Sequence, residues 1–401
     1  MIILNSKSLR RWAGLFLAGL LSSLMVFSQP VAAQTNFCET RDIPNNVAQG
    51  RSYGDPHINT YDGFHYTFQT VGEFILTYSG NGTLASTNKF GEVASVRKSA
   101  NNFGEIANAN VPGRDFEVQA RQSPVPNRDS LSLNTAVAMR VCDQRVGMYV
   151  QDSPDGRSLM WVDGTPIQFV NDVFPLNNGG EIQRQNDRNY TVIWPSGDQV
   201  ALKIINVSGV EFINIMPIVG RDRRNTMVGL LGNFNGNPDD DLVGRDGTRL
   251  ATRSTYSVAT NTLSRALPAA IPVAELETAY FEQLNRQFGD SWRITQAESL
   301  FDYPVGMTTA NFSDRSFPTQ YISLNNASRE ELDAGVTACR EAEVPEDQMD
   351  GCVFDTVATG NNGFADAAVN AVANVAAQRV QDQIEDEIEK IIPGGFRLPS
   401  F

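Results

Sequence analysis

The sequence reads GDPHINTYDG at residues 54–63 and GLLGNFNGNPDDDL at residues 229–242. The second stretch has the composition of an oxygen-ligand loop, with three alternating asparagines, three aspartates and two glycines that allow sharp turns: Asn233, Asn235, Asn237, Asp239, Asp240, Asp241, Gly232 and Gly236. Calcium takes six to eight oxygen ligands of these kinds, which favours calcium over magnesium. Since no glutamate follows at the spacing of an EF-hand, a solvated Asn/Asp/Gly turn stays the alternative.

Short strands are expected between and around the two stretches. Runs rich in β-branched or aromatic residues occur at 74–78, 136–141 and 190–194. Turn signals such as SGNG at 79–82 and PDG at 154–156 separate such runs. The pattern predicts a mainly β fold of two antiparallel sheets over residues 51–260.

The composition becomes helical after about residue 265. Residues 274–288 have helical spacing of their apolar side chains, and Ser328 with Glu331 forms a capping box that opens another helix. These features predict a small helical, cysteine-containing module over residues 265–363. A long helix is expected within the C-terminal region 364–401, where an isoleucine stripe would serve self-association or packing on its own domain.

The first residues have the character of an export signal. Lys7, Arg10 and Arg11 precede an apolar run at 12–27, and Val-Ala-Ala at 31–33 suits signal peptidase. The sequence therefore predicts a signal peptide over residues 1–33, cleaved near Ala33, with an uncleaved membrane anchor as the alternative. We expect a polar linker at 34–50 and no membrane span in the mature chain.

The negative net charge of the chain limits the kinds of binding partner that are expected. The formal net charge is −14, and loss of the three leader cations makes it more negative by three. Nucleic acid and anionic lipid both need a basic surface, so neither is an expected partner. An acidic secreted chain suits an extracellular protein or glycan partner.

Four cysteines are an even number in an oxidising compartment. Cys339 and Cys352 are close in sequence and would close a short loop, which leaves Cys38 with Cys142. Zinc binding by the cysteines is the weaker interpretation, because the chain has no C-x-x-C motif and only two histidines, His57 and His65.

The two quoted stretches resemble the opening and closing signatures of the von Willebrand factor type D domain, GDPH-x-x-T-x-DG and G-L-x-GNFNG-x-x-x-D-D/N-L. The resemblance covers residues 51–250 and is closest to bacterial, cysteine-poor versions, since Leu231 stands where animal members usually carry cysteine. It implies one calcium ion held by residues of both motifs: the side chains of Asp55, Asn233, Asn235, Asp240 and Asp241 and the backbone carbonyl of Asn237. Multimer-forming disulfides are not expected.

The resemblance implies a secreted calcium-binding protein with a structural, adhesive or assembly role, and not an enzyme. One alternative is self-cleavage, in which the Asp55 carboxylate attacks its own carbonyl, Pro56 leaves, and His57 assists as a proton donor. A second alternative is a secreted hydrolase that uses His57 or His65 with Asp55 or Asp62. No H-E-x-x-H motif accompanies these residues.

Overall fold

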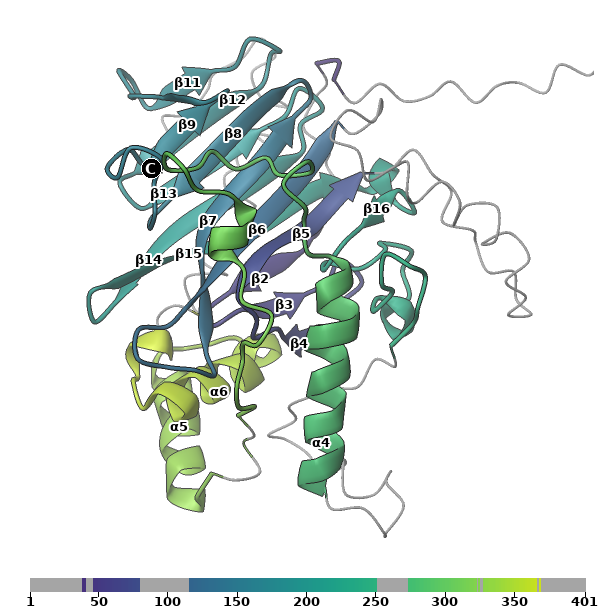
Figure 1. The fold of residues 1–401 in the computed structure, drawn as a ribbon, viewed down its shortest axis with the longest axis vertical. Coiled ribbons are helices and arrows are strands. Elements are labelled where there is room, and N and C mark those ends of the chain that lie inside the picture. The colour runs from purple at the N-terminus through teal and green to yellow at the C-terminus, as the bar shows by residue number, and fades with distance from the viewer. Residues whose placement is uncertain are drawn as a thin grey trace, which may run out of the picture. The chain divides into compact units, whose positions relative to one another are not determined.

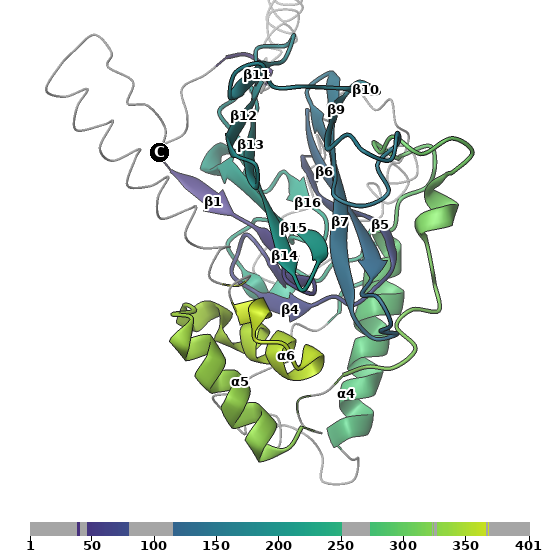
Figure 2. The same cartoon turned by 90° about the vertical axis from the view of Figure 1, so that its left-hand side faces the viewer.

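Two antiparallel sheets pack face to face and enclose the main hydrophobic core (Figure 2). The structure is a computed structural model that describes residues 38–40, 46–79, 115–250, 273–322, 324, 327–365 and 368. All of these residues fall in one compact unit of the chain. The prediction of a mainly β, two-sheet fold with a disulfide-bearing helical region is confirmed.

The first sheet has nine strands, because β1 pairs with β15 beside the main path. The other strands run in the order β11-β12-β13-β14-β15-β2-β3-β4 and are labelled in Figure 1. Its strands are β1 Val47–Gln49, β2 Arg51–Tyr53, β3 His57–Asn59, β4 His65–Thr67, β11 Val173–Pro175, β12 Glu181–Asn186, β13 Asn189–Ile193, β14 Gln199–Val207 and β15 Val210–Gly220. Strand β3 of the opening stretch, 57–59, therefore lies in the same sheet as β15, the long strand that precedes the closing stretch.

The second sheet has seven strands in the order β10-β9-β8-β7-β6-β5-β16. Its strands are β5 Gly72–Ser79, β6 Phe116–Pro124, β7 Ser132–Val141, β8 Gln144–Tyr149, β9 Met160–Val162, β10 Thr165–Pro166 and β16 Met227–Val228. The expected strands at 74–78, 136–141 and 190–194 correspond to β5, β7 and β13. Alternate apolar side chains of the two sheets, such as Val118 and Ile213, are fully buried between them.

The β-domain begins earlier than the sequence suggested. Strand β1 lies inside the range 34–50 that was expected to be a linker, and it pairs with β15 from Val47↔Gly220 to Gln49↔Ile218. Val47 packs against a small cluster of Ala201, Met216 and Ile218, so the strand also contributes apolar contacts.

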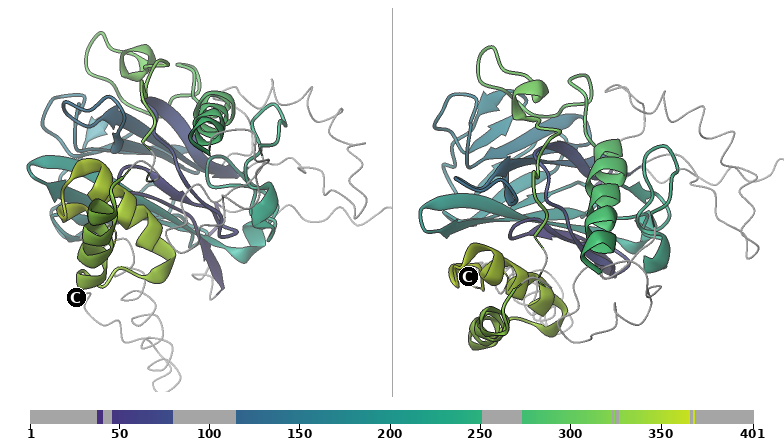
Figure 3. Two further views of the ribbon diagram at one scale, coloured as in Figure 1. Left: turned by 90° about the horizontal axis from the view of Figure 1, so that it is seen from below. Right: turned by 60° about the horizontal axis from the view of Figure 1, so that its bottom comes forward.

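Helices follow the β-strands, as predicted. Helix α4, Val273–Glu282, continues as the π-helix η3, Gln283–Gly289, which together match the expected helix at 274–288. Helix α5, Arg329–Glu341, begins with the predicted capping box of Ser328 and Glu331. Helix α6, Met349–Thr359, packs against α5, and Figure 3 shows that this pair and α4 occupy separate places on the β-domain. The described residues also form short 3-10 helices: η1 Arg221–Arg223, η2 Pro238–Asp240, η4 Thr309–Phe312 and η6 Glu346–Gln348.

Both predicted disulfides are present. Cys38 bonds to Cys142, and Cys339 bonds to Cys352, which joins α5 to α6. Cys339 and Cys352 are 13 positions apart, and closing a loop of about this length stabilises a fold by roughly 3 kcal/mol.

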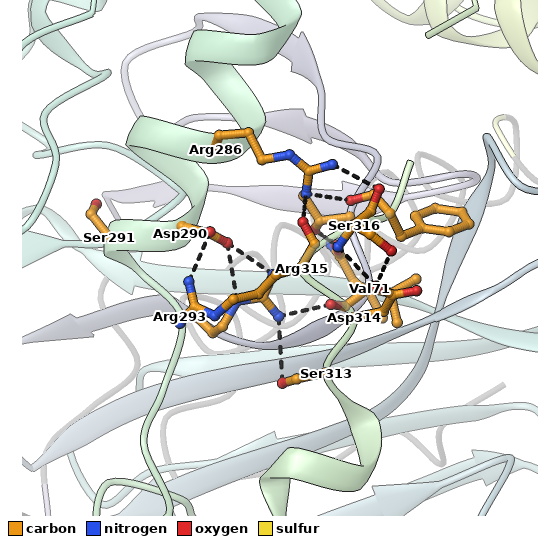
Figure 4. Close-up of polar contacts among 12 residues, drawn as sticks. Val71, Arg286, Asp290, Ser291, Arg293, Ser313, Asp314, Arg315 and Ser316 are labelled. Atoms are coloured by element: carbon orange, nitrogen blue, oxygen red, sulfur yellow. Dashed lines mark hydrogen bonds and ion pairs between the residues drawn. The ribbon is translucent and has the colours of Figure 1, made fainter. Parts of the chain in front are cut away.

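Polar contacts hold the segment after η3 against the β-domain (Figure 4). Arg286 donates to backbone carbonyls of residues 315–318, and Asp290 pairs with Arg293 and Arg315 at 2.9 Å each. Arg293 in turn donates to the carbonyl of Val71 at 2.7 Å. The helical region is thus attached to the edge of the second sheet by specific hydrogen bonds.

Two expected features lie outside the described residues: the signal peptide at 1–33 and nearly all of the C-terminal helix with its isoleucine stripe. Within the described part of the chain, no helix has the length and apolar character needed to cross a membrane.

Candidate functional site

The closing loop, residues 229–242, is joined to the opening stretch by hydrogen bonds. The two carboxylate oxygens of Asp62 accept from the backbone N–H groups of Asn235 and Gly236, at 2.8 Å each. Thr60 donates its hydroxyl to Asp241 Oδ2 at 2.5 Å. Residues more than 170 positions apart in sequence therefore form one site.

Most of the predicted calcium ligands lie together in this loop. The side-chain amides of Asn233 and Asn235 donate to Asp240 Oδ1 at 3.0 and 2.9 Å, and the backbone N–H of Asn233 donates to Asp241 Oδ1 at 3.2 Å. Asn237 caps the turn η2 by accepting from the N–H of Asp239. The loop thus gathers carboxylates and side-chain amides, the kinds of group that bind a hard cation, and the amide oxygens of Asn233 and Asn235 accept from backbone N–H groups of the loop.

Negative charges crowd one another in the loop. Asp241 is nearly fully buried, and its burial, together with the charges of Asp62 and Asp240, raises its pKa to about 7. Gly232 makes room for this carboxylate: its φ is +81°, and a side chain there would meet Asp241. The loop is thus built to bring carboxylates close together.

Asp55 lies in a different group. The buried acid–histidine cluster consists of Asp55, His57 and Asp355, the last from helix α6. His57 Nε2 lies 2.5 Å from Asp355 Oδ1 and 3.1 Å from Asp55 Oδ1. The structure therefore groups Asp55 with His57 and Asp355, and not with the asparagines of the closing loop. Its role as a calcium ligand stays a prediction.

The cluster is buried, and its three charged groups affect one another's pKa. Burial and the charge of Asp355 raise the pKa of Asp55 well above its usual value. Burial alone would lower the pKa of His57, but the charges of Asp355 and Asp55 outweigh it and raise that pKa to about 10. Both effects have the same cause, which is that two carboxylates share one imidazole away from water.

Close packing places the cluster between β3 and α6. Gly54 has a φ of +62°, and a side chain there would meet the Asp355 carboxylate. The ring of Phe354 contacts the His57 ring edge-on, with centroids 5.7 Å apart. Glycine at position 54 of the GDPH motif is therefore needed for α6 to approach the strand.

Two residues of these sites, Asp62 and Asp355, make contacts that were not predicted from the sequence. Asp62 was considered only as a partner of histidine, yet it contacts the closing loop. Its position in the DG turn of the opening stretch was the available signal. Asp355 gave no signal, because nothing in a helical segment 298 residues after His57 marks contact with it.

Comparison with known proteins shows which family part of the β-domain resembles. Residues 106–248 match the von Willebrand factor type D domain family, a region that includes the closing loop and lies within the predicted range 51–260. The opening stretch falls outside that match, but β3 within it and the flanking strands β2 and β4 belong to the same sheet as β12–β15 of the matched region.

The chain is also similar to three mammalian mucins. It is 26% identical to Mucin-4 of Homo sapiens over 77% of the chain, and 21% identical to Mucin-4 of Mus musculus over 80% of the chain. For Mucin-4 of Rattus norvegicus the identity is 22% over 51% of the chain. The matched regions are 4%, 7% and 8% of those proteins, so the chain spans less than a tenth of the relatives' length. The bacterial, cysteine-poor assignment stays a prediction.

Proposed function

We propose that this is an extracellular protein with a structural or adhesive role, in which a calcium ion bound at the closing loop stabilises the type D-like domain. The observation that carries the proposal is the contact of Asp62 and Thr60 with the closing loop. Similarity to mucins supports the extracellular role, and the acidic chain suits a protein or glycan partner.

The residues of the loop fit calcium by their chemistry. Asp62, Asp240 and Asp241 supply carboxylates, and Asn233 and Asn235 supply amide oxygens, with the Asn237 carbonyl as a further ligand. Arg249 approaches Asp240 only to 3.9 Å and is half exposed, so it compensates little of this charge. A bound cation would offset the repulsion and hold the turn between β3 and β4 against the closing loop.

Calcium should raise the stability of the protein measurably. At a free calcium concentration 100 times Kd, we expect the free energy of unfolding to increase by about 2.7 kcal/mol. The measurement is urea unfolding of the full chain with calcium and with a chelator. The Asp240→Asn, Asp241→Asn double variant and the Asp62→Asn variant should each lose most of the calcium-dependent increment.

Asp246→Asn is the matched control. Asp246 lies a few residues beyond the loop and bonds to Thr248, so its removal should leave the calcium increment unchanged. If the unmodified chain has the same free energy of unfolding with calcium and with chelator, the closing loop does not bind calcium and is a solvated turn.

We propose a non-catalytic role because the histidine site has no room for a substrate. His57 Nδ1 lies 3.0 Å from Thr67 Oγ1, and its Nε2 lies 2.5 Å from Asp355 Oδ1. A hydroxyl, an imidazole and a carboxylate in contact are the groups that a nucleophilic hydrolase uses. However, Thr67 is buried, and the cavity beside it measures about 10 Å³. That volume holds about one water molecule. His65, the other candidate, is exposed in β4.

The chain should remain intact at the Asp55–Pro56 bond in mild acid. Attack requires the Asp55 carboxylate to turn onto its own carbonyl, whereas here it lies beside His57 and Asp355 in a fully buried site. The measurement is electrophoresis and N-terminal sequencing after reduction, because the Cys38–Cys142 bond would keep the two pieces together. A new N-terminus at Pro56 would show that the self-cleavage alternative is right.

A further inference from the structure

We propose that the buried acid–histidine cluster of Asp55, His57 and Asp355 is a second metal site, which binds one divalent transition-metal ion of the zinc class and ties helix α6 to the opening stretch. This inference does not depend on calcium binding at the closing loop, since the two sites share no residue of the observed contacts.

The first argument is the shortage of hydrogen-bond donors at the buried carboxylate oxygens. Asp55 is fully buried, and no described residue gives a well-directed hydrogen bond to either of its carboxylate oxygens or to Oδ2 of Asp355. Among the residues that the structure describes, no lysine or arginine forms an ion pair with these two carboxylates. Two buried carboxylates beside one imidazole leave the site a negative charge even when His57 is protonated, so the site needs a further proton or a cation. One divalent ion would neutralise both carboxylates at once.

The second argument is the geometry of the three ligand groups. One ligand atom from each residue lies within 4.8 Å of the other two, and His57 Nε2 is close to both carboxylates. Zinc ligands sit about 2 Å from the ion, hence roughly 3.3 Å from one another in a tetrahedron. A slight widening of the His57–Asp355 contact would therefore admit an ion among the three groups.

The third argument is the kind of ligand and its support. An imidazole nitrogen with carboxylate oxygens suits zinc and its neighbours better than calcium, which prefers oxygen alone. Metal-binding histidines usually make a hydrogen bond through the second ring nitrogen, which fixes the ring. Here Thr67 Oγ1 lies 3.0 Å from His57 Nδ1 and fills that role. A site of this type contains no cysteine, so C-x-x-C spacing would not reveal it.

An ion at this location would join strand β3 to helix α6. Asp55 and His57 flank the start of β3, whereas Asp355 is on α6, which the Cys339–Cys352 bond holds to α5. Gly54 and Gly351 allow the strand and the helix to approach, since a side chain at either position would press on Asp355 or on the His57 ring. A bound ion would couple the helical region to the β-domain across 298 residues of sequence.

The test measures zinc binding by the full chain with the closing loop saturated. Protein stripped with a chelator is returned to excess calcium and titrated with Zn²⁺, and bound zinc is counted by mass spectrometry after gel filtration. Visible absorption of bound Co²⁺ reports coordination by the protein. We expect one zinc per chain, and at least a tenfold loss of affinity in Asp355→Asn and in His57→Gln.

Two further variants separate binding from folding. Thr67→Val keeps all three ligands and the shape of the residue, and loss of a supporting hydrogen bond of this kind weakens metal binding by about 10–100-fold. Asp241→Asn should lose the calcium response but bind zinc as the unmodified chain does. This contrast distinguishes failure at one site from failure at the other.

Two results would overturn the proposal. The first is that the folded, unmodified chain retains no zinc in the presence of calcium, which would mean that protons alone neutralise the cluster. The second is that Asp355→Asn, His57→Gln and Thr67→Val all bind zinc as tightly as the unmodified chain, which would place the ion elsewhere.

Discussion

Replacing Arg223 with methionine should lower the free energy of unfolding by about 3–5 kcal/mol, which is the usual cost of breaking a buried ion pair. The Arg223 side chain is fully buried. Its Nε donates to Asp198 at 2.6 Å, and Nη2 donates to Asp115 at 2.8 Å. Asp115 immediately precedes β6 in the seven-stranded sheet, whereas Asp198 precedes β14 in the nine-stranded sheet. The variant therefore leaves two carboxylates without their cation and removes a tie between the sheets.

Equilibrium urea unfolding of the variant and the unmodified chain measures this effect. Arg184→Met is the matched control, because Arg184 pairs with Asp172 at 3.0 Å on the surface, and exposed pairs contribute about 1 kcal/mol or less. Equal destabilisation by the two variants would contradict the argument from burial.

The architecture could be predicted from sequence because its signals are local or framed by motifs. Strands such as β7 have β-branched residues between clear turns, and Ser328 with Glu331 marks the start of α5 within three residues. The cysteine pairing also followed, since Cys339 and Cys352 are close in sequence and leave Cys38 with Cys142. Strand β1 was missed because Val47–Gln49 is short, and its pairing with β15 is set by the partner strand more than by its own residues.

For the candidate sites too, residues close in sequence could be predicted and residues brought together only by folding could not. The closing loop was found because its asparagines and aspartates lie within one continuous turn. Asp62 was not assigned to it, since only the folded sheet shows that the DG turn faces the loop. The third member of the acid–histidine cluster, Asp355, is on a helix whose docking depends on tertiary packing. Sequence periodicity gives no information about such long-range contacts.

Polar residues at alternate positions can also mislead when another segment covers them. In β6, Glu117, Gln119 and Arg121 alternate with apolar residues, a pattern typical of a face in contact with water. In the structure all three are almost completely buried. The segment around residues 298–312 covers that face, and Gln119 exchanges hydrogen bonds with the backbone of Glu298 and Leu300. The outer face of the second sheet is thus a second, polar interior.

Arg121 is the centre of this covered face, and its replacement by methionine should also cost about 3–5 kcal/mol. Its Nε donates to Glu73 at 2.8 Å, and both side chains are fully buried. Four aromatic rings surround the guanidinium at 3.6–5.7 Å from their centroids: Phe312, Phe301, Tyr303 and Tyr149. Cation–π contacts of this kind contribute when they are shielded from water. Three of the rings belong to the segment after the β-domain, so the variant should also loosen that segment.

A double-mutant cycle separates the two contributions. If the main cost is the stranded carboxylate of Glu73, then Glu73→Gln combined with Arg121→Met should be less destabilising than Arg121→Met alone. If the rings provide the main contribution, the double variant should remain as unstable as the single one, and limited proteolysis should cut within residues 298–312 in both. Urea unfolding gives the energies, and the cleavage pattern shows whether the covering segment has detached. An Arg121→Met variant as stable as the unmodified chain would contradict both explanations, because the covered face would then hold without the Arg121–Glu73 ion pair and without the cation among the rings.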